Sequence, residues 1–238
     1  MTTYNDCIFF TIAGSSGKFS AGPQNIPDFI GGTFSDVEVL DPLPGVGEGK
    51  RLTGGNGVTE NIIRHAHSAL LTVCEENPTK RVFVVTSSYG GRVASHLLAG
   101  KAERKPKDDL SRYFVPDDLP PFSAPNFRGV ISFGYPLCLD KNQGRETILQ
   151  DLENSRIFFV AGSKDPMIKG LADVAAKMQA TNSNHVLYQM IPSGGHNPLK
   201  ATASKKRKAN DDGDDETSSE DDSITNLQTK LTTFLNES

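Results

Sequence analysis

Short apolar segments rich in β-branched and aromatic residues alternate along this chain with segments whose apolar residues have helical spacing. The strand-like segments are residues 7–13, 37–43, 82–85, 128–137, 156–166 and 185–191. The helix-like segments are residues 59–76, with Thr59 as N-cap, and residues 89–100, 146–154, 171–180 and 224–235. Continuously apolar strands are buried on both faces, and helices between them form crossover connections. The pattern therefore predicts an α/β fold with a mostly parallel central sheet and helices on both faces.

The charged residues are concentrated near the end of the chain. The formal net charge is −4, and most of it belongs to a tract in which a basic run precedes a longer acidic run. The basic run is Lys205, Lys206, Arg207 and Lys208. Like-charge repulsion and the scarcity of apolar residues predict disorder there. We therefore expect one domain over residues 1–199, a disordered insertion at 200–223, and a final helix within 224–238 that returns to the domain.

The basic run also has the composition of a nuclear localisation signal. We expect it to contact a nuclear import receptor and to place the protein in the nucleus and/or the cytoplasm; a solvated basic patch is the alternative. The rest of the chain is nearly neutral, so direct nucleic-acid binding is not expected.

Several other classes are disfavoured by the sequence. No apolar run reaches the ~18 residues that a membrane span needs, and the N-terminal segment lacks the basic stretch of a secretory signal. Cys7, Cys74 and Cys138 form no C-x-x-C pair, which favours a reducing compartment over a disulfide framework or a zinc site. The glycine-rich stretches 14–18 and 45–50 lack the spacing of a phosphate-binding loop. We expect neither a cofactor nor a metal.

The sharpest local motif is a small-residue turn, 86–91, between an apolar strand and a helical segment. A serine on such a turn, here Ser88, presents its Oγ at the carboxyl end of the strand. The N–H groups that follow it lie at a helix N-terminus, where they can stabilise an oxyanion. Ser88 is therefore a candidate nucleophile, and an ordinary turn serine is the alternative.

Two further polar residues follow later strands. Asp165 comes after the strand around residues 157–161, and His196 comes just past the last strand, after two glycines. The order Ser, Asp, His, each after its own strand, suits a catalytic triad in which His196 is the general base and Asp165 orients it. Asp165 could instead cap the segment that follows it.

In these motifs the chain resembles the α/β-hydrolases, and most closely the dienelactone-hydrolase-like "testis-expressed" family. That family is related to the hydrolase-like subunit of the nonspecific-lethal histone acetyltransferase complex. The matching segments are the Ser88 turn with Arg92, residues 132–137 (SFGYPL), residues 162–165 and residues 195–197. The resemblance implies an α/β-hydrolase fold over roughly residues 7–198 together with the last helix.

Two departures from the family pattern concern the oxyanion site. The first strand of the family runs into a His-Gly stretch, whereas residues 12–17 here contain no histidine, and Thr86 replaces the glycine two residues before the nucleophile. The expected oxyanion donors are the N–H of Tyr89 and that of Ala13 or Gly14.

Two functions follow as hypotheses. The first is a serine hydrolase of the carboxylester or thioester class, acting on an ester, thioester or small amide of a small-molecule acyl substrate. The second is a hydrolase-fold interaction module with little or no turnover, bound to a protein partner in a nuclear, chromatin-associated complex. Residues 101–126, rich in proline and charge, form either a lid or a solvated loop.

Overall fold

The computed structural model describes residues 4–14, 19, 25–34, 36–40, 57–103, 113–137, 145–181, 183–199 and 218–237. Its strands are β1 (Cys7–Ile12), β2 (Glu38–Leu40), β3 (Arg81–Ser87), β4 (Ala102–Glu103), β5 (Tyr113–Phe114), β6 (Phe127–Phe133), β7 (Arg156–Gly162) and β8 (His185–Ile191). Its helices are α1 (Ile26–Thr33), α2 (Glu60–Glu76), α3 (Tyr89–Ala99), α4 (Arg145–Gln150), α5 (Leu171–Ala180) and α7 (Ser218–Asn236), with a short 3₁₀ helix at Pro166–Ile168.

Six strands form one central sheet in the order β2-β1-β3-β6-β7-β8, and every neighbouring pair is parallel. The predicted parallel sheet is therefore confirmed. Because successive side chains of a strand point to opposite faces, each buried strand contributes to two separate cores. Ile8 and Phe10 of β1 pack on one side, whereas Phe9 packs on the other.

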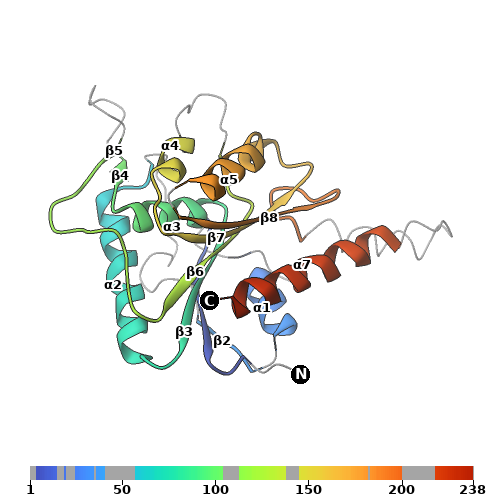
Figure 1. Cartoon of the computed structure of the whole chain (residues 1–238), viewed down its shortest axis with the longest axis horizontal. Coiled ribbons are helices and arrows are strands. Elements are labelled where there is room, and N and C mark those ends of the chain that lie inside the picture. Colours follow the sequence, from blue (N-terminus) through green and yellow to red (C-terminus); the bar gives the residue numbers. More distant parts are fainter. Residues whose placement is uncertain are drawn as a thin grey trace.

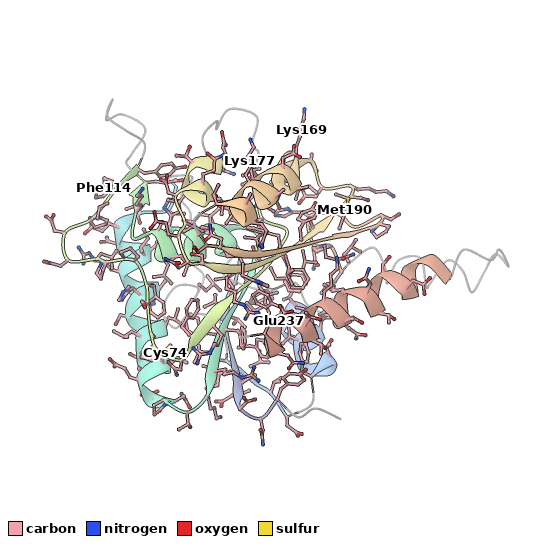
Figure 2. All side chains as sticks on the ribbon, in the orientation of Figure 1. Cys74, Phe114, Lys169, Lys177, Met190 and Glu237 are labelled. Carbon is pink, nitrogen blue, oxygen red and sulfur yellow. The ribbon has the colours of Figure 1, made fainter. Side chains whose placement is uncertain are left out.

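The helices divide between these two faces of the sheet (Figure 1). Helices α2, α3, α4 and α5 cover one face, and α1 and α7 cover the other. Among the described residues, the large apolar side chains that remain exposed are Val115 and Met190, and Met190 lies on the edge strand β8 (Figure 2). Both faces of the sheet are thus covered, as the continuously apolar strands predict.

Helix α7 packs its buried residues against the sheet, and its C-terminal end contacts an arginine of β3 and an arginine of β7. The buried residues are Leu227, Leu231, Phe234 and Leu235. The guanidinium groups of Arg81 and Arg156 donate to the carbonyls of Leu235 and Phe234, where a helix leaves its last carbonyls without intrahelical partners. Positive charges near a helix C-terminus also interact favourably with the helix dipole. Arg156 in addition lies 4.4 Å above the ring of Phe234.

Some boundaries differ from the prediction. Helix α7 begins at Ser218 instead of residue 224, so the last six residues assigned to the disordered insertion are helical. The rest of that insertion, 200–217 with its basic run, lies outside the described residues. Thr59 occupies the N-cap position of α2 but makes no side-chain capping bond. Helix α1 is absent from the prediction, because it is short and lies in a stretch rich in glycine and proline.

The described part of stretch 101–126 differs from the solvated loop that was one of the two expectations. It contains the small antiparallel pair β4–β5, and after this pair the chain packs back onto the domain. Leu119 and Phe122 are buried, and the N–H of Phe122 donates to the carbonyl of Leu97 in α3. The part that the structure describes is thus docked on the domain instead of forming a solvated loop. Residues 104–112 lie outside the described residues.

Candidate active site

The three sequence-predicted polar residues meet at one edge of the sheet. Ser88 follows β3, Asp165 follows β7, and His196 follows β8. Because these strands belong to one parallel sheet, their carboxyl ends lie at the same edge. The fold therefore brings together residues that are up to 108 positions apart in the sequence.

The backbone at Ser88 is strained. Its φ is 51° and its ψ is −118°, a region that side-chain-bearing residues rarely adopt and that costs about 1–3 kcal/mol. Two hydrogen bonds of 2.9 Å hold the turn: Ser88 N–H donates to the Phe133 carbonyl of β6, and Gly91 N–H donates to the Ser88 carbonyl. This sharp turn lets the strand end and α3 begin within a single residue.

Gly90 allows α3 to start against the end of β1. A Cβ placed on Gly90 would lie 2.1 Å from the Ile12 carbonyl oxygen and 2.7 Å from that of Ala13. At the same place, a Cβ on Gly14 would lie 3.4 Å from the Ser88 Cβ. Gly14 thus lies beside the serine, Ala13 lies against Gly90, and Tyr89 is the first residue of α3. The first N–H groups of a helix have no intrahelical acceptor, which leaves that of Tyr89 able to bind an anion.

Thr86 replaces a small residue at the turn, and Gly91 makes the replacement possible. Thr86 is fully buried. A Cβ on Gly91 would lie 2.4 Å from the Ser132 Oγ and 3.3 Å from the Thr86 Oγ1. The space for both hydroxyl groups therefore comes from the missing side chain on α3. Thr86 is therefore accommodated at the turn by Gly91.

The side chains of Ser88, His196 and Asp165 form a continuous chain of hydrogen bonds. His196 Nε2 lies 2.6 Å from Ser88 Oγ, and His196 Nδ1 lies 2.7 Å from Asp165 Oδ2. A carboxylate can only accept, so Nδ1 carries the hydrogen and the Nε2 lone pair faces the serine hydroxyl. The Asp165 side chain is fully buried, whereas that of His196 is 33% exposed. The imidazole is thus anchored at one end and accessible at the other.

Asp165 makes two contacts, one with each carboxylate oxygen. Its second oxygen, Oδ1, accepts from the Met167 N–H at 2.9 Å, which caps the 3₁₀ helix. The cap holds the carboxylate in the orientation that His196 requires. The capping role and the role of a histidine partner are therefore compatible, because each uses a different oxygen.

Close backbone contacts fix the loop that carries His196. Gly134, with φ of +61°, would place a Cβ 2.0 Å from the His196 carbonyl oxygen. Likewise a Cβ on Gly162 would lie 2.3 Å from the Gly194 carbonyl carbon. These glycines let β6 and β7 approach the loop directly. Gly134 belongs to the SFGYPL segment, so its role explains part of that motif.

Other residues considered from the sequence lie away from this chemistry. Cys7 and Cys74 are buried, and burial raises the pKa of Cys7 to about 12 and that of Cys74 to about 11, which suits inert core thiols. Cys138 lies outside the described residues. Within the described ranges, no group of three or more His, Cys, Asp or Glu side chains is placed to hold a metal, and no described helix is long and apolar enough to cross a membrane.

The sequence did not reveal a buried ionic group on the far side of α3. His96 lies there with Arg92 and Glu103. In the sequence, Arg92 stands out only as part of the serine motif, and Glu103 belongs to the charge-rich stretch 101–126. No sequence signal links them, because their contact depends on how β4 packs.

Comparisons with known proteins agree with the fold. The sequence matches an alpha/beta hydrolase domain over residues 54–221, and no curated protein is significantly similar to it.

The structure is similar to a truncated carbohydrate esterase from gut microbiota, with a TM-score of 0.51 and 13% identity over 98% of this chain and 87% of that one. It is also similar to an esterase from Pyrococcus furiosus, with a TM-score of 0.52 and 12% identity. A third similar structure is an alpha-beta serine hydrolase homologue from Coxiella burnetii, with a TM-score of 0.51 and 11% identity. The last two matches each cover 87% of this chain and 83% of the other. At these identities the likeness is one of fold, and it confirms the expected α/β-hydrolase fold.

Proposed function

Because the chain belongs to the alpha/beta hydrolase family, we propose that it is a serine hydrolase that cleaves ester, thioester or small amide bonds through an acyl-enzyme. The observation that carries this proposal is the hydrogen-bond chain from Ser88 through His196 to Asp165, with distances of 2.6 and 2.7 Å. Structural surface serines rarely have such a partner, and a nucleophile requires one.

In the first half-reaction Ser88 Oγ attacks the acyl carbon, and its proton passes to His196 Nε2. The imidazolium that forms is stabilised by the buried Asp165 carboxylate, which also keeps the ring in the tautomer that can accept. His196 then gives the proton to the leaving oxygen, sulfur or nitrogen. In the second half-reaction a water attacks the acyl-enzyme by the same route and releases the acid.

The oxyanion that develops on the acyl carbonyl needs N–H donors beside Ser88. The Tyr89 N–H at the start of α3 supplies one, and that of Ala13 or Gly14 at the end of β1 supplies the other. Donors fixed in this way need no reorganisation during the reaction, and each one typically contributes about 10²–10³-fold in rate. These donors are backbone N–H groups, so they do not depend on a histidine side chain in stretch 12–17.

A fluorophosphonate probe tests the proposal. The probe's phosphorus bonds to an activated serine Oγ and fluoride leaves. Wild type should be labelled, Ser88→Ala should not, and Ser193→Ala, which changes another loop serine near His196, should label as wild type does. A folded wild-type protein that resists labelling would rule out the hydrolase proposal.

A second candidate is a hydrolase-fold interaction module in a nuclear complex, with a protein partner in place of a substrate. It is favoured by Thr86 and by stretch 12–17, both of which depart from the pattern of the family, and by the resemblance to the testis-expressed family. Entry into the nucleus would use the basic run Lys205, Lys206, Arg207 and Lys208, which lies outside the described residues and would contact an import receptor.

Alanine at these four positions tests the nuclear part of this candidate. The wild-type protein tagged with a fluorescent protein should accumulate in nuclei, and the variant should spread evenly between nucleus and cytoplasm. The same distribution for both proteins would rule out a localisation signal here. The result does not depend on turnover, so it is independent of the serine-labelling experiment.

A further inference from the structure

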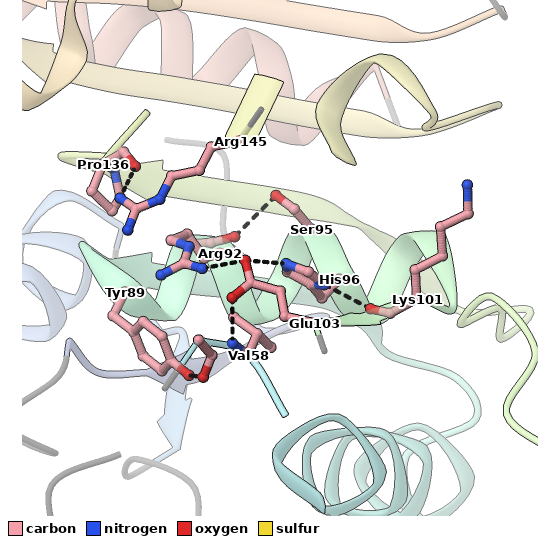
Figure 3. Close-up of polar contacts among 11 residues, drawn as sticks. Val58, Tyr89, Arg92, Ser95, His96, Lys101, Glu103, Pro136 and Arg145 are labelled. Atoms are coloured by element: carbon pink, nitrogen blue, oxygen red, sulfur yellow. Dashed lines mark hydrogen bonds and ion pairs between the residues drawn. The ribbon is translucent and has the colours of Figure 1, made fainter. Parts of the chain in front are cut away.

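Glu103 is the centre of a buried ionic group behind the helix that follows the nucleophile (Figure 3). One carboxylate oxygen, Oε1, accepts a hydrogen bond from the Arg92 guanidinium and lies 3.5 Å from His96 Nε2. The other, Oε2, accepts from the Val58 N–H at 3.0 Å. The side chains of Arg92, Glu103 and His96 are 7%, 5% and 1% exposed. Burying several charges costs desolvation free energy unless the charges pair with good geometry. The burial of this group next to α3 therefore has to be explained.

The charge on Glu103 is retained in the folded protein. Burial raises the pKa of its carboxyl group, but the hydrogen bond with His96 and the positive charge of Arg92 outweigh burial and hold that pKa well below its usual range. At neutral pH the carboxylate is therefore ionised, and a charged acceptor makes stronger hydrogen bonds than a neutral one. A neutral side chain at position 103 would leave the buried Arg92 charge without this carboxylate.

Glu103 and Tyr89 together hold the backbone of residues 57 and 58, an arrangement we call the 57–58 clamp. The Tyr89 hydroxyl donates to the Gly57 carbonyl at 2.8 Å, and Glu103 accepts from the next N–H in the chain, that of Val58. A Cβ on Gly57, whose φ is +77°, would lie 1.9 Å from Glu103 Oε2, so the carboxylate sits directly on this glycine. Arg92, which pairs with Glu103, lies 5.4 Å from the centre of the Tyr89 ring.

The clamp therefore fixes the side chain of Tyr89, whose backbone N–H is a proposed oxyanion donor. Tyr89 directly follows the strained Ser88, and strained backbone persists only where its surroundings hold it. An oxyanion donor must also lie within about 2.7–3.1 Å of the developing charge, so a small rotation of residue 89 weakens it. We propose that Glu103 is a positioning residue: through Arg92 and the 57–58 clamp it holds Tyr89 N–H in the direction that the oxyanion requires. This inference rests on the proposed serine-hydrolase function.

Two variants and one control test the role of Glu103. Glu103→Gln keeps the shape of the side chain and removes its charge. Tyr89→Phe removes only the hydroxyl that holds Gly57. The control is Asn126→Asp, an isosteric change in a buried amide that donates to the carbonyls of Cys74, Asn77 and Lys80, before β6 and away from α3.

The measurements are kcat per labelled active site, KM, and the inhibition constant of an aryl trifluoromethyl ketone. Ser88 Oγ bonds to the ketone carbon, the serine proton passes to His196, and the ketone oxygen becomes an oxyanion that needs the same donors. Glu103→Gln should lower kcat by about tenfold with KM unchanged, and should weaken ketone binding by the same factor. Tyr89→Phe should likewise lower kcat and weaken ketone binding. Asn126→Asp should lower thermal stability while kcat and ketone binding stay at wild-type values.

The inference is overturned if the folded Glu103 and Tyr89 variants keep wild-type kcat and ketone affinity. If Glu103→Gln does not fold, Tyr89→Phe decides alone, because it leaves the Arg92–Glu103 pair intact. Fluorophosphonate labelling distinguishes a failure of the hydrolase proposal from a failure of the role proposed for Glu103. A wild type that does not react with fluorophosphonate contradicts the hydrolase proposal, whereas a reactive wild type with unaffected variants contradicts only the role of Glu103.

Discussion

Replacing Gly90 by alanine should damage both stability and activity, although alanine is the better helix former. The added Cβ would lie 2.1 Å from the Ile12 carbonyl oxygen, and real Cβ contacts do not fall below 3.0 Å. The end of β1 must therefore retreat by about 0.9 Å, the difference between these two distances. Alanine in a helix gains ~1 kcal/mol over glycine, whereas overpacking against backbone costs ~3 kcal/mol, the upper end of its usual range. We expect a net loss of ~2 kcal/mol in the free energy of unfolding.

The same retreat should lower activity further, because it moves Ala13 and Gly14 away from Ser88. A displacement of this size at an oxyanion site can cost about 10²-fold in kcat/KM. The matched control is Gly32→Ala in α1, where nothing lies within 4 Å of the added Cβ. That change should raise stability by ~0.5–1 kcal/mol and leave activity unchanged.

Urea unfolding followed by far-UV circular dichroism measures the stability of both variants, and ester hydrolysis per labelled active site measures their activity. The two substitutions are chemically identical, so their difference reports only on the surroundings. A Gly90→Ala protein that is as stable and as active as Gly32→Ala would refute the close approach of α3 to β1.

Three further outcomes are expected. Asp165→Asn should lower kcat by about 10⁴-fold with the fold retained, since an amide can hold His196 in the wrong tautomer; a loss below tenfold would contradict the role of Asp165. Phe234→Ala should cost ~3–5 kcal/mol in urea unfolding, because its ring is fully buried between α7 and the sheet; a loss under 1 kcal/mol would mean that α7 is not docked. Below the ordinary Glu pKa of 4.5 the unfolded chain takes up a proton that folded Glu103 does not. Wild-type stability should then fall with acid by up to ~1.4 kcal/mol per pH unit more than that of Glu103→Gln, and parallel stability curves would contradict the depressed pKa.

The central sheet could be predicted from the sequence because burial on both faces leaves a continuous apolar signal. The bounds predicted for residues 171–180 and 185–191 match those of α5 and β8. The positions of Ser88, Asp165 and His196 could be predicted for a related reason: in a parallel sheet, residues that follow different strands converge at one edge. Local pattern and topology together were sufficient for these features.

The remaining features depend on tertiary contacts that leave no periodic signal. Thr86 looked unfavourable at the turn because the sequence does not show that Gly91 of α3 makes room for it. Glu103 lies in the charge-rich stretch 101–126, and its burial with Arg92 appears only when β4 is placed against α3. The early start of α7 was missed because residues 218–223 are acidic and polar, whereas the helix is stabilised mainly by its apolar C-terminal half.

The central claim is that Ser88 forms an acyl-enzyme. The most direct measurement traps that intermediate with an aryl carbamate, which acylates a serine and is hydrolysed slowly, and determines the intact mass and the modified peptide. The account predicts one carbamoyl group per chain on the peptide that contains Ser88, release of one equivalent of phenol, and no adduct on Ser88→Ala. A folded wild type without an adduct, or an adduct that persists in Ser88→Ala, would contradict it.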